Sequence, residues 1–418
     1  MNRYYLCIDL KTFFASVECV ERGLDPFETD LVVADPDRCT TTICLAISPK
    51  MKSRGIRNRC RLFEIPKGIN YIQAKPRMKK YIEYSSRIYG IYLKYVSKED
   101  IHVYSIDEAF LDVTSYLSLY KMSPIELAKV IMKDIFYTTG ITATAGVGTN
   151  MYLAKIALDI TAKHVSDNIG YLDEKKYKDE LWHHTPLMDF WQVGRGIETR
   201  LNKLGIFDMY DISHSDEAIL YKEFGVNAKF LIDHSWGAEP CLISDIKKYK
   251  PKSTSISNGQ VLFRDYNYID ARKVLIEMID TLVLQLVDKH LSTSVIGFYI
   301  GYSHDIYPAL KMSKKLSNPS NSFSKISRVI LDEYDFSIER KYPIKRINIW
   351  FGGLASKKIE QFDLFSDNTL EESDEKIENV MNMIKNKFGK NAILRAISYE
   401  EGATQRERNK LIGGHNAE

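Results

Sequence analysis

The sequence lacks any apolar run near the roughly 20 residues that a membrane-spanning helix needs. Its first residues enter a strand-like pattern with no signal peptide, so we expect a cytoplasmic protein with no membrane partner. The six cysteines form no CxxC pair and no cluster with histidine at zinc-binding spacing. Reduced thiols are therefore expected, without disulfides or structural zinc.

What is present is an ordinary globular composition, with 44% hydrophobic and 27% charged residues in 418. This length predicts three or four domains of roughly 70 to 150 residues. Residues 1–240 carry 31 Lys+Arg against 32 Asp+Glu, residues 241–360 carry 19 against 12, and residues 361–418 carry 8 against 11. A basic module between a near-neutral body and an acidic tail indicates a polyanionic partner or, on charge alone, a solvated basic face.

Residues 104–113 hold two adjacent carboxylates, Asp107 and Glu108, between short apolar runs, a pattern typical of a hairpin with acids at its tip. Adjacent acids repel each other and resist burial unless a cation lies between them, and a hard divalent metal is the natural candidate. The alternative is an ordinary acidic turn.

A third acid, Asp9, lies near the end of the apolar run at residues 4–10, which predicts a buried strand. Thr12 is expected to cap a helix that ends near residue 22. After the hairpin come a predicted helix at 124–137 and a strand at 141–147.

This order is that of a ferredoxin-like βαββαβ sheet, in which the first and third strands are neighbours. Asp9 and the Asp107/Glu108 pair are then expected to meet at one edge of the sheet. An inserted lobe is predicted between the first helix and the hairpin, with strands at 31–35, 42–48 and 69–74 and a helix at 76–95.

Residues 50–61 of this lobe contain six cations, which suit a segment that closes over phosphates or, equally, a solvated surface. Residues 187–206 predict two helices joined by a glycine hairpin at Val193–Gly196, and a helix is expected at 150–163. Such a hairpin can grip a phosphate through backbone N–H groups, or it can be a tight turn between helices.

Residues 237–253 predict a linker, and beyond it lies a second α+β unit. Its predicted elements are strands at 255–263, 294–301 and 344–351, helices at 269–289 and 324–334, and a polar loop after 301. Residues 356–418 are expected to form a tail with one or two helices and little core of their own.

The motifs together resemble the Y-family of translesion DNA polymerases, in the UmuC-like branch. The resemblance rests on Ile8-Asp-Leu-Lys-Thr-Phe-Phe-Ala-Ser-Val-Glu18, Tyr104-Ser-Ile-Asp-Glu-Ala-Phe-Leu-Asp112 and Ala145-Gly-Val-Gly-Thr-Asn150, and it covers most of residues 1 to about 355. It implies a multidomain α+β fold: a ferredoxin-like palm (1–24 and 75–180), fingers (25–74), a helix-hairpin-helix thumb (181–240), a βα little finger (250–355) and a tail (356–418).

The resemblance implies a template-directed polymerase that adds deoxynucleotides to a primer 3′-hydroxyl, with low fidelity and no proofreading. Its metal ligands fall on Asp9, Asp107, Glu108 and the backbone carbonyl of Leu10, where two Mg²⁺ ions would drive phosphoryl transfer. The partners it implies are primer–template DNA and deoxynucleoside triphosphates, and we expect a monomer.

For the nucleotide, the resemblance implies contacts from Phe13, the sugar-excluding ring Phe14, Lys52, and Lys163, which lies one residue out of register. Pro49 and Lys50 stand where many relatives have Tyr and Glu, so the grip on the triphosphate is expected to differ.

The DNA backbone would be gripped at Gly194 and Gly196. Two other classes stay open on the residues alone: a nucleotidyl cyclase-like palm enzyme, and a catalytically silent DNA-binding scaffold.

The acidic tail begins with Gln361-Phe-Asp-Leu-Phe365, which resembles the Gln-x-x-Leu-Phe peptide that docks bacterial polymerases on the sliding clamp. Gln361, Leu364 and Phe365 would make the contact. Exposed large apolar residues are a liability without a partner pocket. The alternative is that Leu364 and Phe365 pack on the second unit or on the tail helix.

Overall fold

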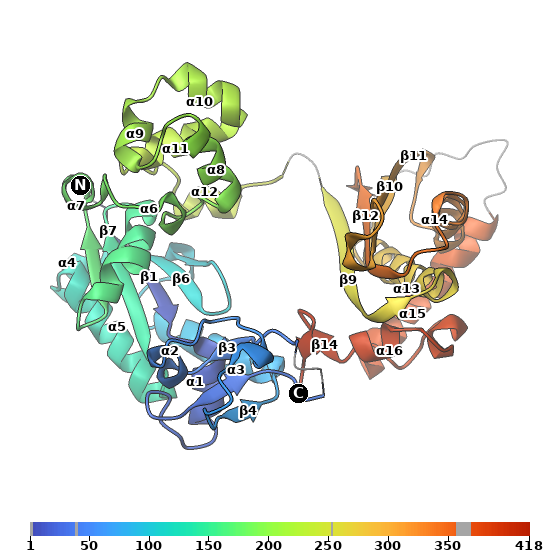
Figure 1. Cartoon of the computed structure of the whole chain (residues 1–418), viewed down its shortest axis with the longest axis horizontal. Coiled ribbons are helices and arrows are strands. Elements are labelled where there is room, and N and C mark those ends of the chain that lie inside the picture. The colour runs from blue at the N-terminus through green and yellow to red at the C-terminus, as the bar shows by residue number, and fades with distance from the viewer. Residues whose placement is uncertain (1–2, 38–40, 252–253, 357–368) are drawn as a thin grey trace. The chain divides into compact units, whose positions relative to one another are not determined.

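A computed structural model describes residues 3–37, 41–251, 254–356 and 369–418 (Figure 1). Contacts divide the chain into two compact units, residues 1–249 with 415–418, and residues 250–414. Each unit is described by itself. Within the described residues, no helix combines the length and the apolar character needed to cross a lipid bilayer.

The first unit is built on a five-stranded sheet with the order β5-β6-β1-β7-β8. All neighbours are antiparallel except β7 and β8. The first four strands have the order of a ferredoxin-like sheet, so the predicted neighbourhood of the first and third strands is confirmed. The strands are β1 (Tyr5–Leu10), β5 (Ile101–Val103), β6 (Glu108–Asp112), β7 (Ala143–Gly148) and β8 (Ile169–Leu172).

Close packing of a helix on β7 depends on two glycines. A Cβ on Gly146 would lie 2.0 Å from the Ala154 carbonyl oxygen, and one on Gly148 would lie 2.2 Å from the Ala154 nitrogen. Both clashes are with the backbone of α6 (Met151–Ile156), so only glycine lets this helix approach the sheet. The other helices of this region are α1 (Phe13–Val20), α3 (Met78–Tyr92), α4 (Tyr116–Tyr120) and α5 (Pro124–Thr139).

The inserted lobe carries a small sheet with the order β3-β2-β4. Its elements are β2 (Leu31–Val33), β3 (Ala46–Ile47), α2 (Pro49–Ser53) and β4 (Ile72–Ala74). The strand predicted at 42–48 is mostly wrong, because only two of its residues pair as β3. Ser48 instead caps α2 by accepting the Met51 N–H, with Pro49 in the first turn.

The predicted helix cap at Thr12 is also wrong. Thr12 precedes α1 with φ 46°, and its hydroxyl makes no cap hydrogen bond. It instead lies 3.1 Å from the Ser16 hydroxyl, one turn along the same helix.

A helical region ends the first unit and has its own buried cluster, which includes Tyr177, Phe190 and Leu231. The predicted first helix of the glycine hairpin is a single 3₁₀ turn, Leu187–Asp189, and the second is α8 (Arg195–Lys203), so Gly196 lies inside a helix rather than in the hairpin. The remaining helices are α7 (Glu174–Leu181), α9 (Met209–His214), α10 (Glu217–Phe224), α11 (Ala228–Ser235) and α12 (Ile243–Lys248).

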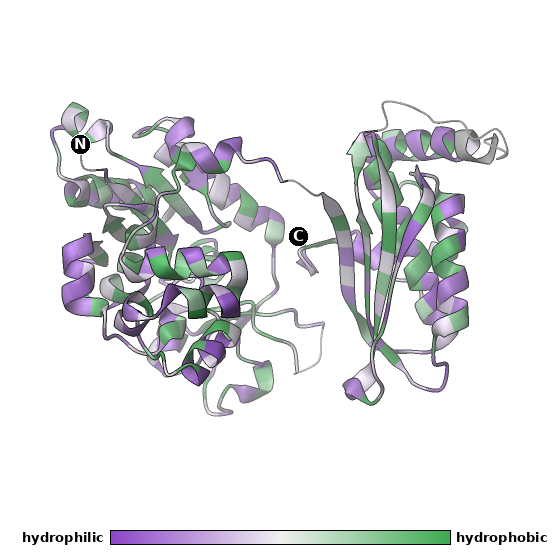
Figure 2. Cartoon of the chain, turned by 90° about the horizontal axis from the view of Figure 1, so that it is seen from above, coloured by the Kyte–Doolittle hydropathy of each residue, from purple (hydrophilic) through white to green (hydrophobic). Residues whose placement is uncertain are grey.

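The second unit is built on a five-stranded antiparallel sheet. Its strands β11-β10-β12-β9 are neighbours in that order, the short β13 also pairs with β10, and the core lies against α13 and α14. Figure 2 shows apolar and polar residues alternating along its long strands. The polar loop predicted after residue 301 is wrong, because most of it is the edge strand β11, whose lysines hid the alternation. The elements are β9 (Ser255–Tyr266), α13 (Tyr268–Asp288), β10 (Leu291–Tyr302), β11 (Leu310–Ser320), α14 (Phe323–Ser337), β12 (Ile344–Gly352) and β13 (Ala355–Ser356).

Most residues of the expected tail that the structure describes are packed against the second unit. Glu277 of α13 is 2% exposed and accepts hydrogen bonds from the backbone N–H groups of Thr404 and Gln405. Residues 369–414 therefore belong to the second unit rather than to a separate tail. Their elements are α15 (Thr369–Phe388), a 3₁₀ turn (Ala396–Tyr399), α16 (Gln405–Arg408) and β14 (Leu411–Ile412), and β15 (His415–Asn416) follows.

Candidate active site

Strand pairing brings the three candidate carboxylates to one end of the first sheet. Asp9 of β1 lies directly opposite Glu108 of β6. Asp107 ends the turn before β6, and its carbonyl accepts the Leu10 N–H at 3.0 Å. Asp9 and Glu108, 99 positions apart in the sequence, thus become neighbours, as the predicted strand order required.

The Glu108 carboxylate is held from two sides. Lys155 Nζ lies 2.9 Å from Oε1 and 3.0 Å from Oε2, and the Cys7 thiol donates to Oε1 at 3.1 Å. Lys155 also contacts Asp159 at 3.1 Å. Burial raises the pKa of the Cys7 thiol, and the nearby Glu108 charge raises it further, so Cys7 stays a neutral donor.

Asp107 and Asp9 are less well compensated. The Ser105 hydroxyl donates to Asp107 at 2.6 Å. Burial raises the pKa of Asp9 to about 7, and the charges of Asp107 and Glu108 add to the effect. Lys155 pairs with Glu108 and Asp159, whereas no described lysine or arginine forms an ion pair with Asp9 or Asp107.

The donor set fits a hard divalent cation, although the side chains do not surround one point. Across the described ranges, no three or more His, Cys, Asp or Glu side chains are grouped closely enough to hold a metal ion. Glu108 turns to Lys155 and Asp107 turns to Ser105. A cation would compete with these partners, and carboxylate oxygens with the Leu10 carbonyl are ligands that Mg²⁺ prefers.

Three lysines converge on the same end of the sheet. Burial lowers the pKa of Lys52, the Asp9 charge raises it, and the charges of Lys163 and Lys11 lower it again. Lys52 from α2 therefore lies within the electrostatic influence of Asp9 and of the other two lysines. Such a cluster beside carboxylates can bind a phosphate chain.

The helix that leads to Lys163 is irregular. A π-helical turn, Ala157–Thr161, lies between Lys155 and Lys163. A π turn holds one more residue than an α turn, so it changes the direction of Lys163 relative to an unbroken α-helix. Such turns occur frequently at functional sites.

The two aromatic residues that open α1 differ in exposure. The Phe13 ring is 2% exposed and belongs to the core, so only its backbone remains for the predicted nucleotide contact. Phe14 is half-buried, and its ring centroid lies 4.6 Å from that of Tyr81. Phe14 is therefore the ring that can face a bound sugar.

The glycine hairpin presents open backbone. Gly194 caps α8, and its carbonyl accepts the N–H groups of Ile197 and Glu198. A Cβ at Gly194 or Gly196 would meet nothing within 4 Å, so a ligand can approach both residues closely. The first N–H groups of a helix are a natural phosphate contact.

Several residues of the site were missed from the sequence. Lys11 lies inside the first motif and Lys155 inside the predicted helix at 150–163, but nothing in their spacing distinguishes them from surface lysines. Cys7 alternates with Asp9 along β1, so it shares the face of Asp9, and that period-2 signal could have found it. Trp191 donates to the Tyr104 hydroxyl at 3.1 Å, a long-range contact with no sequence signal.

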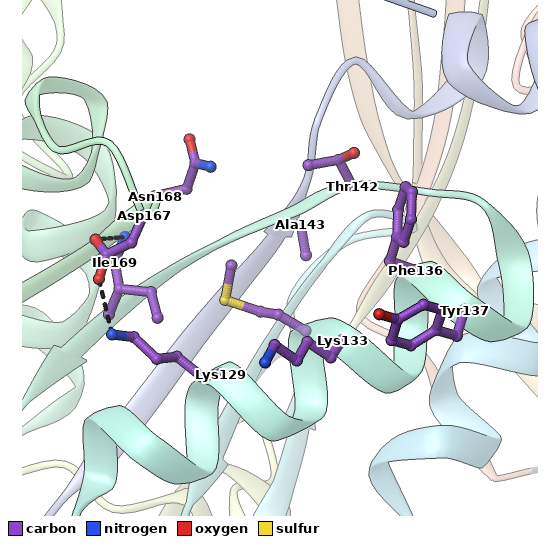
Figure 3. Close-up of a pocket in the computed structure, with 10 residues that line it drawn as sticks. Lys129, Lys133, Phe136, Tyr137, Thr142, Ala143, Asp167, Asn168 and Ile169 are labelled. Atoms are coloured by element: carbon purple, nitrogen blue, oxygen red, sulfur yellow. Dashed lines mark hydrogen bonds and ion pairs between the residues drawn. The ribbon is translucent and has the colours of Figure 1, made fainter. Parts of the chain in front are cut away.

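A separate pocket of about 410 Å³ lies between α5 and the starts of β7 and β8 (Figure 3). Phe136 and Tyr137 line one side, and Lys129 pairs with Asp167 at 3.0 Å on the other. None of the three carboxylates lines it, so it is not the acidic site.

Comparisons with known proteins identify the family of the chain. The impB/mucB/samB family matches residues 8–159, and the C-terminal domain of that family matches residues 253–364. UvrX of Bacillus subtilis, whose name refers to UV-damage repair, is 32% identical over 98% of this chain and 97% of its own. DNA polymerase IV 2 of the same organism is 30% identical over 98% and 97%.

Among solved structures, a chimera of the Y-family DNA polymerases Dbh and Dpo4 matches with a TM-score of 0.65 at 22% identity, over 84% of this chain and 99% of that one. The fold is thus that of a polymerase built from palm, fingers, thumb and little finger. The chain belongs to the Y-family of DNA polymerases and is a translesion DNA-directed DNA polymerase, acting on DNA and nucleotide substrates. This excludes the cyclase and silent-scaffold alternatives.

Proposed function

We propose that this polymerase extends a primer by two-metal phosphoryl transfer, with low fidelity and without proofreading. The observation that carries the proposal is the pairing of Asp9 with Glu108. Burial lowers the pKa values of Lys52 and Lys11, and both lie near enough to Asp9 for its charge to act in the opposite direction. Asp9, Asp107, Glu108 and the Leu10 carbonyl would hold two Mg²⁺ ions. When bound, these ions would neutralise the charge that develops on the reacting phosphate.

The residues of the chain then divide the remaining work. Lys52, Lys163 and Lys11 would bind the triphosphate, in place of the tyrosine that many relatives have at Pro49. Phe14 would lie under the sugar and leave no room for a 2′-hydroxyl. Before the nucleotide binds, the carboxylates of Asp9, Asp107 and Glu108 repel one another. This repulsion favours binding of a nucleotide that brings its divalent cations.

For DNA, Gly194 and Gly196 would contact the backbone, together with the open face of the second sheet. On that face lie Lys311, Lys315 and Arg346, which alternate with residues packed on the helices. The binding would be salt-dependent and only weakly sequence-dependent. We also propose a cytoplasmic monomer in which palm, fingers and thumb have the limits that the motifs predict, and in which residues 369–414 belong to the little-finger unit.

The clamp peptide, Gln361, Leu364 and Phe365, lies outside the described residues. We propose that it docks on the sliding clamp and raises the local concentration of polymerase at the primer end. Leu364→Ala with Phe365→Ala should abolish clamp-stimulated synthesis and leave clamp-independent single-nucleotide addition intact. Stimulation that survives in this double variant would contradict docking, and a lower melting temperature would favour packing.

The catalytic assignment is tested by single-nucleotide addition to a primer–template with Mg²⁺. Asp107→Ala and Glu108→Ala should abolish addition. Asp112→Asn is the matched control, because this carboxylate lies on the same strand but contacts Arg3 and the Thr114 N–H. Near-wild-type extension by Asp107→Ala at saturating Mg²⁺ would contradict the assignment.

A further inference from the structure

A fully buried carboxylate lies one helical turn from Phe14. Glu18 of α1 is 0% exposed, which is costly for a charged group unless donors surround it. Arg77 donates to its two oxygens at 3.0 and 2.9 Å, and the Tyr81 hydroxyl donates at 2.8 Å. Arg22 pairs with the same group from the next turn of the chain.

This set of contacts fixes the ring beside Phe14. Tyr81 is 0% exposed, so its ring is packed on all sides, and Glu18 holds its hydroxyl. The ring centroids of Tyr81 and Phe14 lie 4.6 Å apart at an interplanar angle of 34°. Phe14 and Glu18 are four residues apart on one helix and therefore lie on the same face. Tyr81 bridges them from α3.

We propose that Glu18, Arg77 and Tyr81 act as positioning residues that hold the Phe14 ring in place and thereby set the discrimination against ribonucleotides. The inference rests on the proposed role of Phe14 as the sugar-excluding ring. Exclusion of one hydroxyl depends on the ring position to a fraction of an ångström, since a small retreat of the ring opens the space that the 2′-oxygen needs. The buried charge therefore serves selectivity rather than chemistry.

The chain offers a matched control three residues further along α3. The Tyr84 hydroxyl donates to Glu21 at 2.8 Å, which is the same type of tyrosine–glutamate bond between the same two helices. Tyr84 has no ring contact with Phe14 among the described aromatic pairs. Tyr84→Phe thus removes an equivalent hydrogen bond without touching the ring beside the sugar.

The experiment measures kcat and KM of the full-length enzyme for a deoxynucleotide and for the matching ribonucleotide, with melting temperatures alongside. Tyr81→Phe should lower the deoxy-to-ribo ratio of kcat/KM about 2- to 10-fold, the range that one hydrogen bond corresponds to. Glu18→Gln should lower it in the same direction, mainly by a lower KM for the ribonucleotide. Tyr84→Phe should leave the ratio unchanged.

A double variant separates this inference from the role of Phe14. If Tyr81 acts through Phe14, then Phe14→Ala with Tyr81→Phe should show no further loss of discrimination beyond Phe14→Ala alone. If Phe14→Ala lowers the ratio but Tyr81→Phe does not, the positioning role is overturned and the excluding ring stands. If Phe14→Ala leaves the ratio unchanged, the excluding ring itself is refuted. An equal loss for both nucleotides in Tyr81→Phe, matched by Tyr84→Phe, would show a merely structural role and overturn the inference.

Discussion

The acids at the end of the first sheet and Glu277 of the second unit are stabilised in opposite ways. In the first unit, burial raises the pKa of Asp9 to about 7, and the charges of Asp107 and Glu108 raise it as well. In the second unit, Glu277 accepts the N–H groups of Thr404 and Gln405 as well as the Thr404 hydroxyl at 3.2 Å. One set of acids is left in need of a cation, and the other is satisfied by donors.

This difference distinguishes a site from a structural bond. A satisfied carboxylate contributes to stability, and its removal leaves buried donors without a partner. A cluster of carboxylates without enough donors lowers the stability of the fold. Such a cluster is typical of a site that binds a ligand. Glu18 of the first unit resembles Glu277 in this respect, because three side chains donate to it. Burial of an acid is thus no sign of catalysis until its donors are counted.

The largest expected effect is that Asp107→Asn loses activity but keeps its stability, whereas Glu277→Gln loses stability but keeps its activity. Asp107→Asn should lower single-nucleotide addition about 10³-fold or more, since a lost metal ligand removes several kcal/mol of transition-state stabilisation. Its melting temperature should stay or rise, because repulsion with Asp9 is relieved. Glu277→Gln should instead lower the free energy of unfolding by about 1–3 kcal/mol and leave the chemistry at saturating DNA near wild type. Thermal melts and primer extension on both variants check the comparison, and a stability loss in Asp107→Asn would break it.

The sequence predicted most of the first unit because its signals are local and periodic. The order of strands and helices, together with motif spacing, placed Asp9 beside Glu108 correctly. Prediction from the sequence failed where tertiary contacts determine the local backbone conformation. Thr12 has cap chemistry but adopts φ 46°, and the expected strand at 42–48 is largely taken up by the approach to α2.

The second unit was harder to predict for a physical reason. β11 is an edge strand with lysines on its open face, so its alternation between polar and apolar residues is weak. Residues 395–409 bind α13 through polar contacts such as those of Glu277, which leave no hydrophobic period in the sequence. The partners of Glu108 were missed for the same reason, because Lys155 looks like any helical lysine.

The next effect concerns the open face of the second sheet. Lys311→Gln with Lys315→Gln should lower the slope of log K against log salt by about 1.8, since each phosphate contact contributes about 0.9. Lys314 is the matched control, because it lies between them in β11 but pairs with Glu333 of α14. DNA-binding titrations from 50 to 200 mM salt measure the slope. An equal change in Lys314→Gln would show that general charge, rather than one face, governs binding.

The next prediction concerns Lys155, which would compete with a bound metal ion for Glu108. Lys155→Met removes the cation that holds Glu108, so the metal-free protein should lose about 1–3 kcal/mol of stability. Mg²⁺ should then raise the melting temperature of the variant more than that of wild type, because a bound cation stabilises the folded state by mass action. Lys129→Met, which loses an exposed pair with Asp167, is the control. An equal Mg²⁺ shift in all three proteins would contradict the competition between Lys155 and the metal.

The smallest effect is a pH dependence in the second unit. Glu378 of α15 is 1% exposed, and burial raises its pKa to about 8, although the Phe323 N–H donates to it at 3.1 Å. A folded pKa above the unfolded value means that the folded state binds this proton more tightly. The free energy of unfolding should therefore be greatest below about pH 4.5 and should fall as the pH rises toward 8.

Glu378→Gln keeps the acceptor for Phe323 and removes the ionisation, so this component of the pH dependence should vanish. Its melting temperature should match wild type near pH 5 and exceed it near pH 8.5. Glu401→Gln, at an exposed position of the same unit, should change neither value. A Glu378→Gln variant that melts below wild type at pH 8.5 would mean that the ionised carboxylate is well solvated by donors such as Arg395, 3.8 Å away, and would place Glu378 with Glu277 among the satisfied acids.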